Sequence, residues 1–323
     1  MNNELIKARI IRSHQREFDC KIEVDGQIVK ATALGNLLKR GDTVVVGDYV
    51  LLEEMSDTSE YIIKEVIERE NEIYRILVRE SKKKVTAANC NYLVILNSVA
   101  KPKYKRGIVD RFLVRAYQWG LTPLVIFNKM DKYDENDFDI NFEVQRLSDL
   151  EVDCFEISAL DPNYTKRYLD KGIEEFNEIL KGKTSLFVGQ SGVGKSQTIT
   201  KLSNGDVVLK TKEVGKAGKG SHTTTWSEIV DCGDFDLIDS PGIRSFSLDD
   251  IDPEDLIEYF PDIHELTTKC EYSTCTHLPD NKGCAFYMGD LEDSELVHSR
   301  LESFLFLKDE ISSTTFWQKK AKY

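Results

Sequence analysis

The eight residues from Gly189 to Ser196 combine glycine, lysine and serine at spacings suited to binding phosphate. They read Gly-Gln-Ser-Gly-Val-Gly-Lys-Ser, follow the apolar run 185–188, and open an expected helix over 195–202. Glycines allow backbone N–H groups to approach phosphate oxygens closely, and the positive end of the helix dipole favours a polyanion. A chance glycine turn is the alternative. Lys195 is expected at the terminal phosphates and Ser196 at Mg²⁺. The other expected nucleotide contacts are Gly189, Gln190, Ser191, Gly192, Val193, Gly194 and Gln197.

A second motif, Asn128-Lys129-Met130-Asp131, follows an apolar run that ends at Phe127. The Asp131 carboxylate can accept hydrogen bonds from the ring and exocyclic N–H groups of guanine, whereas adenine presents no matching pair. A polar strand end is the alternative meaning, and it is common for one such tetrapeptide. The expected guanine contacts are Asn128 as a brace, Lys129 over the base, Met130 and Asp131, with a backbone N–H from Ser158-Ala159 near the guanine oxygen.

Two further segments have the residues of nucleotide-sensitive switches. The first is a Gly- and Lys-rich stretch, 214–221, that leads into His222, Thr223, Thr224 and Thr225. One of these threonines is expected to reach Mg²⁺ and the terminal phosphate, although the sequence does not say which. The second is Asp239-Ser240-Pro241-Gly242, where Asp239 would hold Mg²⁺ through water and the N–H of Gly242 would meet the departing phosphoryl group.

Four residues near the C-terminus form a candidate metal site. Cys270, Cys275, His277 and Cys284 supply three thiolates and one imidazole, which is a closed tetrahedral set suited to one structural Zn²⁺. Four ligands leave no open position for catalysis. Unpaired thiols are the alternative, with His264 as a substitute ligand.

Composition places the chain among ordinary globular proteins of more than one domain. It has 323 residues, of which 41% are hydrophobic and 31% charged, and seven cysteines suit a reducing compartment. No apolar segment predicts a membrane span or a secretion signal, so a cytoplasmic location is expected. The net charge is −13, yet residues 76–115 carry ten Lys or Arg against two acids, and residues 249–311 carry seventeen acids against four bases. The basic stretch could face a phosphate backbone, although a solvated charged face is the commoner meaning.

The elements around these motifs fall into three groups. Short alternating apolar runs within residues 5–70, with a hairpin turn at Asp25-Gly26, predict an N-terminal OB-like β-barrel, expected over 1–75. After a charged connector over 79–84, apolar strands alternate with helical segments, which predicts a parallel α/β domain over 85–245. Residues 246–323 are expected to form a zinc-binding helical domain, in which helical spacing over 291–311 indicates core packing.

The order of the motifs narrows the interpretation. In a common GTPase the phosphate loop comes first, whereas here the guanine motif and Ser158-Ala159 precede it and Asp239-Ser240-Pro241-Gly242 comes last. The chain is therefore expected to be a multidomain α/β protein with a circularly permuted P-loop GTPase domain. These motifs, together with the preceding β domain and the Gly-Lys-Gly-Ser-His-Thr-Thr-Thr segment 218–225, closely resemble those of the RsgA (YjeQ) family of ribosome-assembly GTPases. The resemblance covers about residues 5–310.

The resemblance implies a GTP hydrolase that acts in late maturation of the small ribosomal subunit and contacts its rRNA. It also implies a zinc site of this type, although the family typically has five residues between the histidine and the last cysteine, and this chain has six. The residue after the Asp-Ser-Pro-Gly element is Ile243, which can neither orient nor deprotonate water, so slow intrinsic hydrolysis is expected. His222 is the hypothesised catalytic substitute, as the resemblance also suggests, and it acts together with Lys195.

Two other functional classes stay open at this stage. The first is a non-catalytic RNA assembly protein that binds GTP as a structural ligand, which Ile243 keeps possible. The second is a P-loop kinase for a small molecule, for which the sequence shows no evident acceptor pocket and which would not need a guanine motif. Nothing in the sequence requires an oligomer, so a monomer is expected.

Overall fold

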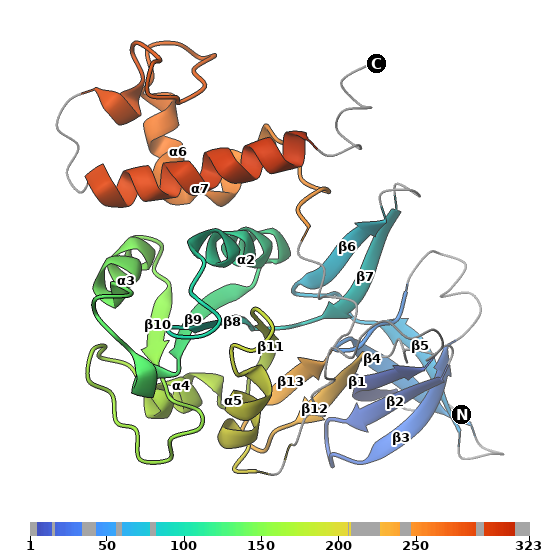
Figure 1. Ribbon diagram of the computed structural model, residues 1–323. Coiled ribbons are helices and arrows are strands. Elements are labelled where there is room, and N and C mark those ends of the chain that lie inside the picture. The colour runs from blue at the N-terminus through green and yellow to red at the C-terminus, as the bar shows by residue number, and fades with distance from the viewer. Residues whose placement is uncertain are drawn as a thin grey trace, which may run out of the picture.

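The structure is a computed structural model in which the N-terminal barrel and the C-terminal helices flank a central α/β domain (Figure 1). The barrel adjoins one edge of the central sheet. Helix α7 (Ser294–Ser312) lies across α2 (Arg106–Trp119) and α3 (Ile140–Ser148), and α6 (Pro261–Thr268) packs against α7. The structure describes residues 5–14, 17–33, 43–55, 60–77, 82–205, 207, 227–239, 247–288 and 294–313.

The N-terminal domain is the expected β-barrel, and it has five strands. Its strand order is β1-β2-β3-β5-β4, and β4 pairs again with β1, which closes it. Alternate residues such as Ala8 and Ile10 point into a shared apolar core. The chain turns at Asp25-Gly26 between the antiparallel strands β2 and β3, as predicted. The strands are β1 Ile6–His14, β2 Glu17–Ile22, β3 Ile28–Ala33, β4 Tyr49–Glu54 and β5 Tyr61–Val66.

A six-stranded sheet of order β10-β9-β8-β11-β13-β12 forms the centre of the molecule. All its pairs are parallel except that of the edge strand β12 with β13. Its inner strands are continuous apolar runs because helices cover both faces. The strands are β8 Tyr92–Ser98, β9 Thr122–Asn128, β10 Asp153–Glu156, β11 Thr184–Val188, β12 Glu228–Asp231 and β13 Asp236–Asp239.

The helices divide between the two faces of this sheet. Buried residues of α2 and α3, such as Phe112 and Leu147, share one apolar core with one face of the strands. Phe176 of α4 and Ile199 of α5 share the core of the opposite face. Alternation of strand and helix therefore gives the predicted α/β domain. The helices are α2 Arg106–Trp119, the short 3₁₀ turn η1 Met130–Lys132, α3 Ile140–Ser148, α4 Ile173–Leu180 and α5 Lys195–Leu202.

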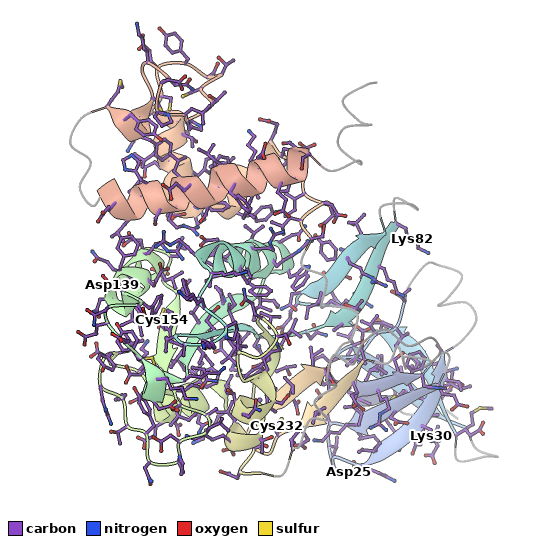
Figure 2. All side chains as sticks on the ribbon, in the orientation of Figure 1. Asp25, Lys30, Lys82, Asp139, Cys154 and Cys232 are labelled. Atoms are coloured by element: carbon purple, nitrogen blue, oxygen red, sulfur yellow. The ribbon has the colours of Figure 1, made fainter. Side chains whose placement is uncertain are left out.

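A separate hairpin lies between the barrel and the central sheet. It consists of β6 Glu72–Leu77 and β7 Lys82–Ala88 and spans the expected boundary between the first two domains. The prediction of a charged connector was wrong for Lys82, Lys83 and Lys84, since these residues are paired with β6 (Figure 2). The three lysines can occupy this strand because their side chains are exposed to water, whereas Ile73 and Ala87 of the same hairpin are buried.

The C-terminal domain is a small helical unit with its own apolar core. Leu301 and Leu307 of α7 are buried against α6 and the segment around Cys284, so the predicted core packing of this helix is confirmed. Val114 of α2 belongs to the same core, which attaches the domain to the central one. Its elements are η3 Asp255–Tyr259, α6 Pro261–Thr268, η4 Ala285–Tyr287 and α7 Ser294–Ser312.

Candidate functional site

The sequence motifs meet at one edge of the central sheet. The phosphate loop follows β11, the guanine motif begins at Asn128, the last residue of β9, and Asp239 ends β13. Because β9, β8, β11 and β13 run parallel, their carboxyl ends lie at the same edge, where ligands of open α/β sheets bind. The guanine motif precedes the phosphate loop in the chain, so the sheet has the permuted order.

Glycine is required at two positions of the phosphate loop. Gly189 has φ 146°, and a Cβ there would lie 2.2 Å from the carbonyl oxygen of Leu96 in β8. Gly194 has φ 106°, and its Cβ would lie 2.3 Å from Nδ2 of Asn128. Any side chain would strain the backbone and displace its neighbours. The loop is thus packed directly against the strand and the guanine motif beside it.

Lys195 and Ser196 occupy the first turn of α5, at the end of this loop. The ammonium of Lys195 donates to the carbonyl oxygens of Gly189, at 2.7 Å, and Gln190, at 3.2 Å. It therefore lies within the curl of the loop, where phosphate oxygens would be bound. Ser196 is half-buried beside it.

Asn128 connects the phosphate loop to the two segments expected to bind guanine. Its Nδ2 donates to the carbonyl of Val193 at 2.8 Å. Its Oδ1 accepts from the N–H of Lys129 at 2.8 Å and from the N–H of Ala159 at 3.0 Å. Of the backbone N–H groups of Ser158-Ala159, one of which is predicted to lie near the guanine oxygen, that of Ala159 thus already donates to Asn128. One side chain, 2% exposed, fixes three loops relative to one another.

Lys129 and Asp131 are held in place by neighbouring loops. The Lys129 ammonium donates to the carbonyls of Gly192, at 2.7 Å, and Lys101, and burial lowers its pKa below the ordinary value. Ser158 Oγ donates to Oδ1 of Asp131, which orients the carboxylate. Met130 is buried in the core under the sheet edge, so its side chain faces away from the site.

Several predicted site residues lie outside the described residues. They are His222, Thr223, Thr224, Thr225 and Gly242, together with Ile243. Their assignments remain predictions. Asp239 is described, and its position at the end of β13 brings it to the edge that carries the phosphate loop.

The four predicted metal ligands of the C-terminal domain come together. One donor atom from each of Cys270, Cys275, His277 and Cys284 lies within 4.8 Å of all the others. Nδ1 of His277 is 3.5 Å from Sγ of Cys270 and 3.9 Å from Sγ of Cys284. Ligands about 2.0–2.3 Å from a tetrahedral Zn²⁺ are themselves separated by about 3.5–3.8 Å, so the donor set fits that ion. His264 is not part of the cluster.

The six-residue interval between His277 and Cys284 is accommodated inside the loop. The N–H of Asn281 donates to the carbonyl of Leu278 at 3.0 Å, and the N–H of Cys284 donates to the carbonyl of Asn281 at 3.3 Å. These turns, with Gly283 at φ 74°, return Cys284 to the other ligands. The extra residue therefore changes the loop without displacing the fourth donor.

Two charged residues that the motifs do not contain hold the loop after β10. Glu156, 1% exposed, accepts backbone N–H groups from the far half of this loop. Lys201, on the last turn of α5, donates to two carbonyls of the near half. Sequence reasoning missed both because their partners are set by the fold and not by a local pattern.

Comparison with known proteins agrees with this geometry. A family model described as RsgA GTPase matches residues 66–249. The small ribosomal subunit biogenesis GTPase RsgA of Bacteroides fragilis is 32% identical over 313 residues, which cover 94% of this chain and 97% of that relative. A protein of Listeria monocytogenes, small ribosomal subunit biogenesis GTPase RsgA 2, is 30% identical over 290 residues, covering 90% and 92%.

Two solved structures share the fold over nearly the whole chain. The crystal structure of YjeQ from Thermotoga maritima has a TM-score of 0.75 and 26% identity, covering 96% of this chain and all of that one. The structure of YloQ, described as a circularly permuted GTPase, has a TM-score of 0.71 and 24% identity, covering 96% of each chain. Among the described residues, no helix is both long and apolar enough to cross a membrane.

Proposed function

The chain belongs to the RsgA GTPase family, and we propose that it hydrolyses GTP to assist late maturation of the small ribosomal subunit. The observation that carries the GTPase assignment is Asn128, which joins the phosphate loop to the guanine motif through one buried amide. The names of the relatives support the ribosomal role. In this proposal the protein docks on the subunit with GTP and leaves after hydrolysis.

The described residues have separate roles in binding the nucleotide. We assign the phosphates to backbone N–H groups of 189–197 and to the Lys195 ammonium, which would exchange its two carbonyl partners for phosphate oxygens. Asp131 would accept the N–H groups of guanine, and Lys129 would cover the base. Because Ser158 holds the Asp131 carboxylate, this acceptor is oriented before the base arrives.

Hydrolysis requires charge stabilisation and a positioned water. Mg²⁺ bound with the nucleotide would neutralise phosphate charge, and we assign its ligands to Ser196, Asp239 and one of Thr223, Thr224 and Thr225. Lys195 would stabilise charge on the terminal phosphoryl group. We assign the water to His222, since Ile243 occupies the position where many GTPases have glutamine. Gly242 would respond to the loss of the terminal phosphate.

We assign one Zn²⁺ to Cys270, Cys275, His277 and Cys284, in a structural role. A bound ion would join the start of η4 and the end of α6 to the loop between them, because Cys284 directly precedes η4 and Cys270 follows α6 by two residues. Elemental analysis should find one zinc per chain and none in Cys275→Ser, whereas zinc-free wild-type protein of unchanged stability would contradict the assignment. A monomer in the cytoplasm that contacts rRNA is part of the same proposal.

A non-catalytic GTP-binding assembly protein is the second candidate, favoured by Ile243 at the water-positioning site. The two functions differ in a direct experiment. GTP hydrolysis would be measured with and without purified small ribosomal subunits, with Lys195→Ala as background. Strong stimulation by the small subunit is expected, whereas tight subunit binding without stimulation would favour the non-catalytic function.

A further inference from the structure

The loop between β10 and α4 carries Ser158 and Ala159, yet it has no regular secondary structure between Ile157 and Gly172. Such a long loop would not by itself hold a carboxylate-orienting serine in a fixed place. Besides the hydrogen bond from the N–H of Ala159 to Asn128, two charged side chains anchor this loop, one for each half. The two anchors come from different elements and differ in their relation to the nucleotide.

The first anchor is Glu156, the last residue of β10. Its carboxylate accepts from the N–H groups of Tyr168 and Leu169, at 2.9 and 2.8 Å, and of Arg167, and from the hydroxyl of Tyr164 at 3.2 Å. Four donors satisfy a buried carboxylate, so this anchor holds the far half of the loop as part of the core. None of these contacts reaches Ser158 or the guanine motif.

The second anchor is Lys201, and it holds the near half. Its ammonium donates to the carbonyl of Ser158 at 2.8 Å and to the carbonyl of Asp161 at 3.1 Å. The side chain of Lys201 is half-buried, and this burial lowers its pKa against the opposing effect of Asp161. Hydrogen bonds from a partly desolvated cation to carbonyls are stronger than neutral ones.

These contacts connect the helix that follows the phosphate loop to the carboxylate of Asp131, which is proposed to bind guanine. Lys201 lies on α5, which begins at Lys195, and it fixes the backbone of Ser158. Ser158 in turn donates its hydroxyl to Asp131. We propose that Lys201 is a positioning residue for guanine selection, because it fixes Ser158 and thereby the orientation of the Asp131 carboxylate. This inference rests on the proposed function, since it assumes that Asp131 binds guanine.

The test compares nucleotides that differ in the group Asp131 would bind. Inosine diphosphate lacks the exocyclic amino group of guanine, so the ratio of its dissociation constant to that of GDP reports this contact. Calorimetric titrations would measure both nucleotides with wild type, Lys201→Met, Lys201→Arg and Asp131→Ala. Lys183→Met is the matched control, because Lys183 is an exposed lysine just before β11, at the other end of the strand.

For Lys201→Met we expect about tenfold weaker GDP binding. The ratio of the dissociation constant of inosine diphosphate to that of GDP should fall toward the value of Asp131→Ala. Lys201→Arg should restore the ratio, since its guanidinium can donate to both carbonyls. Equal weakening of both nucleotides, or no weakening, would overturn the positioning role while leaving the GTPase assignment intact. Wild-type protein that does not prefer GDP would instead overturn the guanine assignment of Asp131, and the inference with it.

Discussion

The two outer domains are attached to the central domain in different ways. Besides the apolar contact through Val114, buried charges on helices hold the C-terminal domain. The barrel is held by strand pairing, by the part-buried Arg9, and by more exposed ion pairs of Arg12 and Lys21. A buried ion pair depends on both partners, because removing one leaves an uncompensated charge away from water. Backbone pairing contains no side chain that a substitution can remove. The two junctions should therefore fail in response to different changes.

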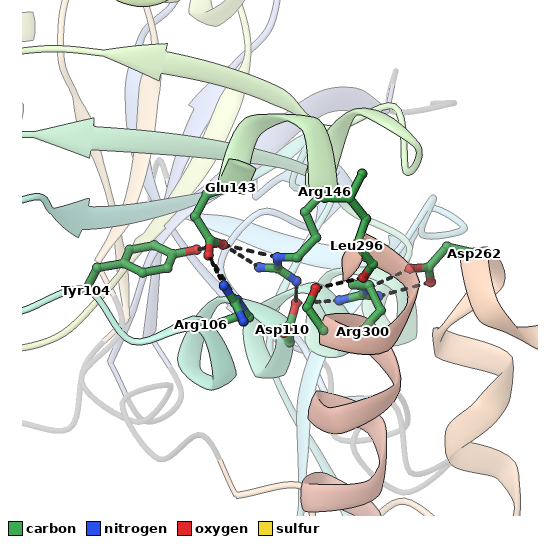
Figure 3. Close-up of polar contacts among 9 residues, drawn as sticks. Tyr104, Arg106, Asp110, Glu143, Arg146, Asp262, Leu296 and Arg300 are labelled. Atoms are coloured by element: carbon green, nitrogen blue, oxygen red, sulfur yellow. Dashed lines mark hydrogen bonds and ion pairs between the residues drawn. The ribbon is translucent and has the colours of Figure 1, made fainter. Parts of the chain in front are cut away.

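At the C-terminal junction, Asp110 of α2 is fully buried between two arginines (Figure 3). Arg146 of α3 donates to its Oδ1 at 2.7 Å, and Arg300 of α7 donates to the same oxygen. Arg300 also donates to Asp262 of α6 at 2.6 Å. Glu143 extends the network on the other side, since it accepts from Arg106, Arg146 and Tyr104.

Three arginines of the basic stretch 76–115 are part of this junction or lie beside it. Arg106 binds Glu143, Arg111 binds Glu310, and Arg115 binds Asp250. The charge of these side chains is thus matched inside the protein. Lys82 and Lys84 of β7 are exposed and have no acidic partner among the described residues, so under the proposed function they are the better candidates for the rRNA contact.

At the barrel junction, one register pair, Arg12 with Glu228, joins β1 to β12. Arg9 reaches across to the central domain and donates to Asp236 at 2.9 Å, Thr184 at 2.7 Å and the carbonyl of Asn89 at 3.2 Å. Gly47 lies against the backbone of Ala88, where an added Cβ would be 2.0 Å from the carbonyl oxygen. The junction therefore combines close backbone approach with the hydrogen bonds of Arg9.

Arg300→Met should have the largest effect. It leaves Asp262 without its arginine and Asp110 with one cation in place of two, so we expect a loss of about 3–5 kcal/mol in the free energy of unfolding. Urea titration would measure it. Arg111→Met is the matched control, because Arg111 also joins α2 to α7 but its partner Glu310 is 40% exposed, and about 1 kcal/mol is expected. Equal losses of unfolding free energy in the two variants would mean that the burial of an ion pair does not determine its contribution to stability here.

Gly47→Ala should be next, with about 3 kcal/mol, since the left-handed backbone at φ 91° adds about 1 kcal/mol to the overpacking against Ala88. Gly26→Ala is the control for the backbone term alone. Gly26 has φ 72°, and its Cβ would be 3.9 Å from the nearest atom, the Cε of Lys21. A cost at Gly47 no greater than that at Gly26 would show that the barrel does not depend on this close approach.

Arg9→Met should cost about 2 kcal/mol, because it removes three hydrogen bonds from a part-buried cation. Arg12→Met, whose side chain is 48% exposed, should change the free energy of unfolding by less than about 1 kcal/mol. The same urea titrations measure both. If Arg12 proved the more costly, the exposed strand edge and not Arg9 would hold the barrel.

The two junctions should also differ in their response to acid, which is the smallest effect. Burial alone would raise the pKa of Asp110, but Arg300 and Arg146 outweigh it, and the pKa lies below its ordinary value of 3.8. The unfolded chain therefore takes up the proton first, and the stability from Asp110 is complete above pH 3.8 and is lost as pH falls through the folded-state pKa. Burial raises the pKa of Asp236 above 3.8, with Arg9 opposing it, so its contribution has the opposite slope.

Unfolding free energies of Asp110→Asn and Asp236→Asn between pH 3 and 7 would separate these slopes. The destabilisation by Asp110→Asn should be constant at neutral pH and shrink below about pH 4. The stability of wild type relative to Asp236→Asn should instead rise as the pH falls through the pKa of Asp236. Parallel slopes for the two variants would contradict the assignment of Asp110 as the charged centre of its junction.

The contrast also explains what the sequence could predict. The phosphate loop and the guanine motif are contiguous, and apolar runs mark the strands before them, so both motifs and their shared sheet edge could be inferred. The barrel, the permuted order and the meeting of the four metal ligands were likewise predictable from local patterns. Glycine positions could not be ranked from sequence, because the close approaches of Gly47 and Gly189 depend on other strands.

Pairs that are distant in the sequence could not be inferred. Arg300 and Asp110 are 190 residues apart, and Lys201 and Ser158 are 43 apart, so no spacing rule connects them. A count of charges over 76–115 likewise could not tell an arginine that is paired inside the protein from a lysine that faces water. The hairpin strand β7 was missed because three consecutive lysines are not a usual strand sequence.

The central claim, a GTPase that reads guanine through Asp131 beside the phosphate loop, has one direct test. Asp131→Asn replaces an acceptor with an amide that can donate to the 2-oxygen of xanthine, so hydrolysis of GTP and of xanthosine triphosphate would be measured for both proteins. We expect wild type to prefer GTP and the variant to reverse the preference by about a hundredfold. GTP loses the bond from its exocyclic amino group and xanthosine triphosphate gains one to its 2-oxygen, each of about 1.5 kcal/mol. A variant that still prefers GTP would contradict the account.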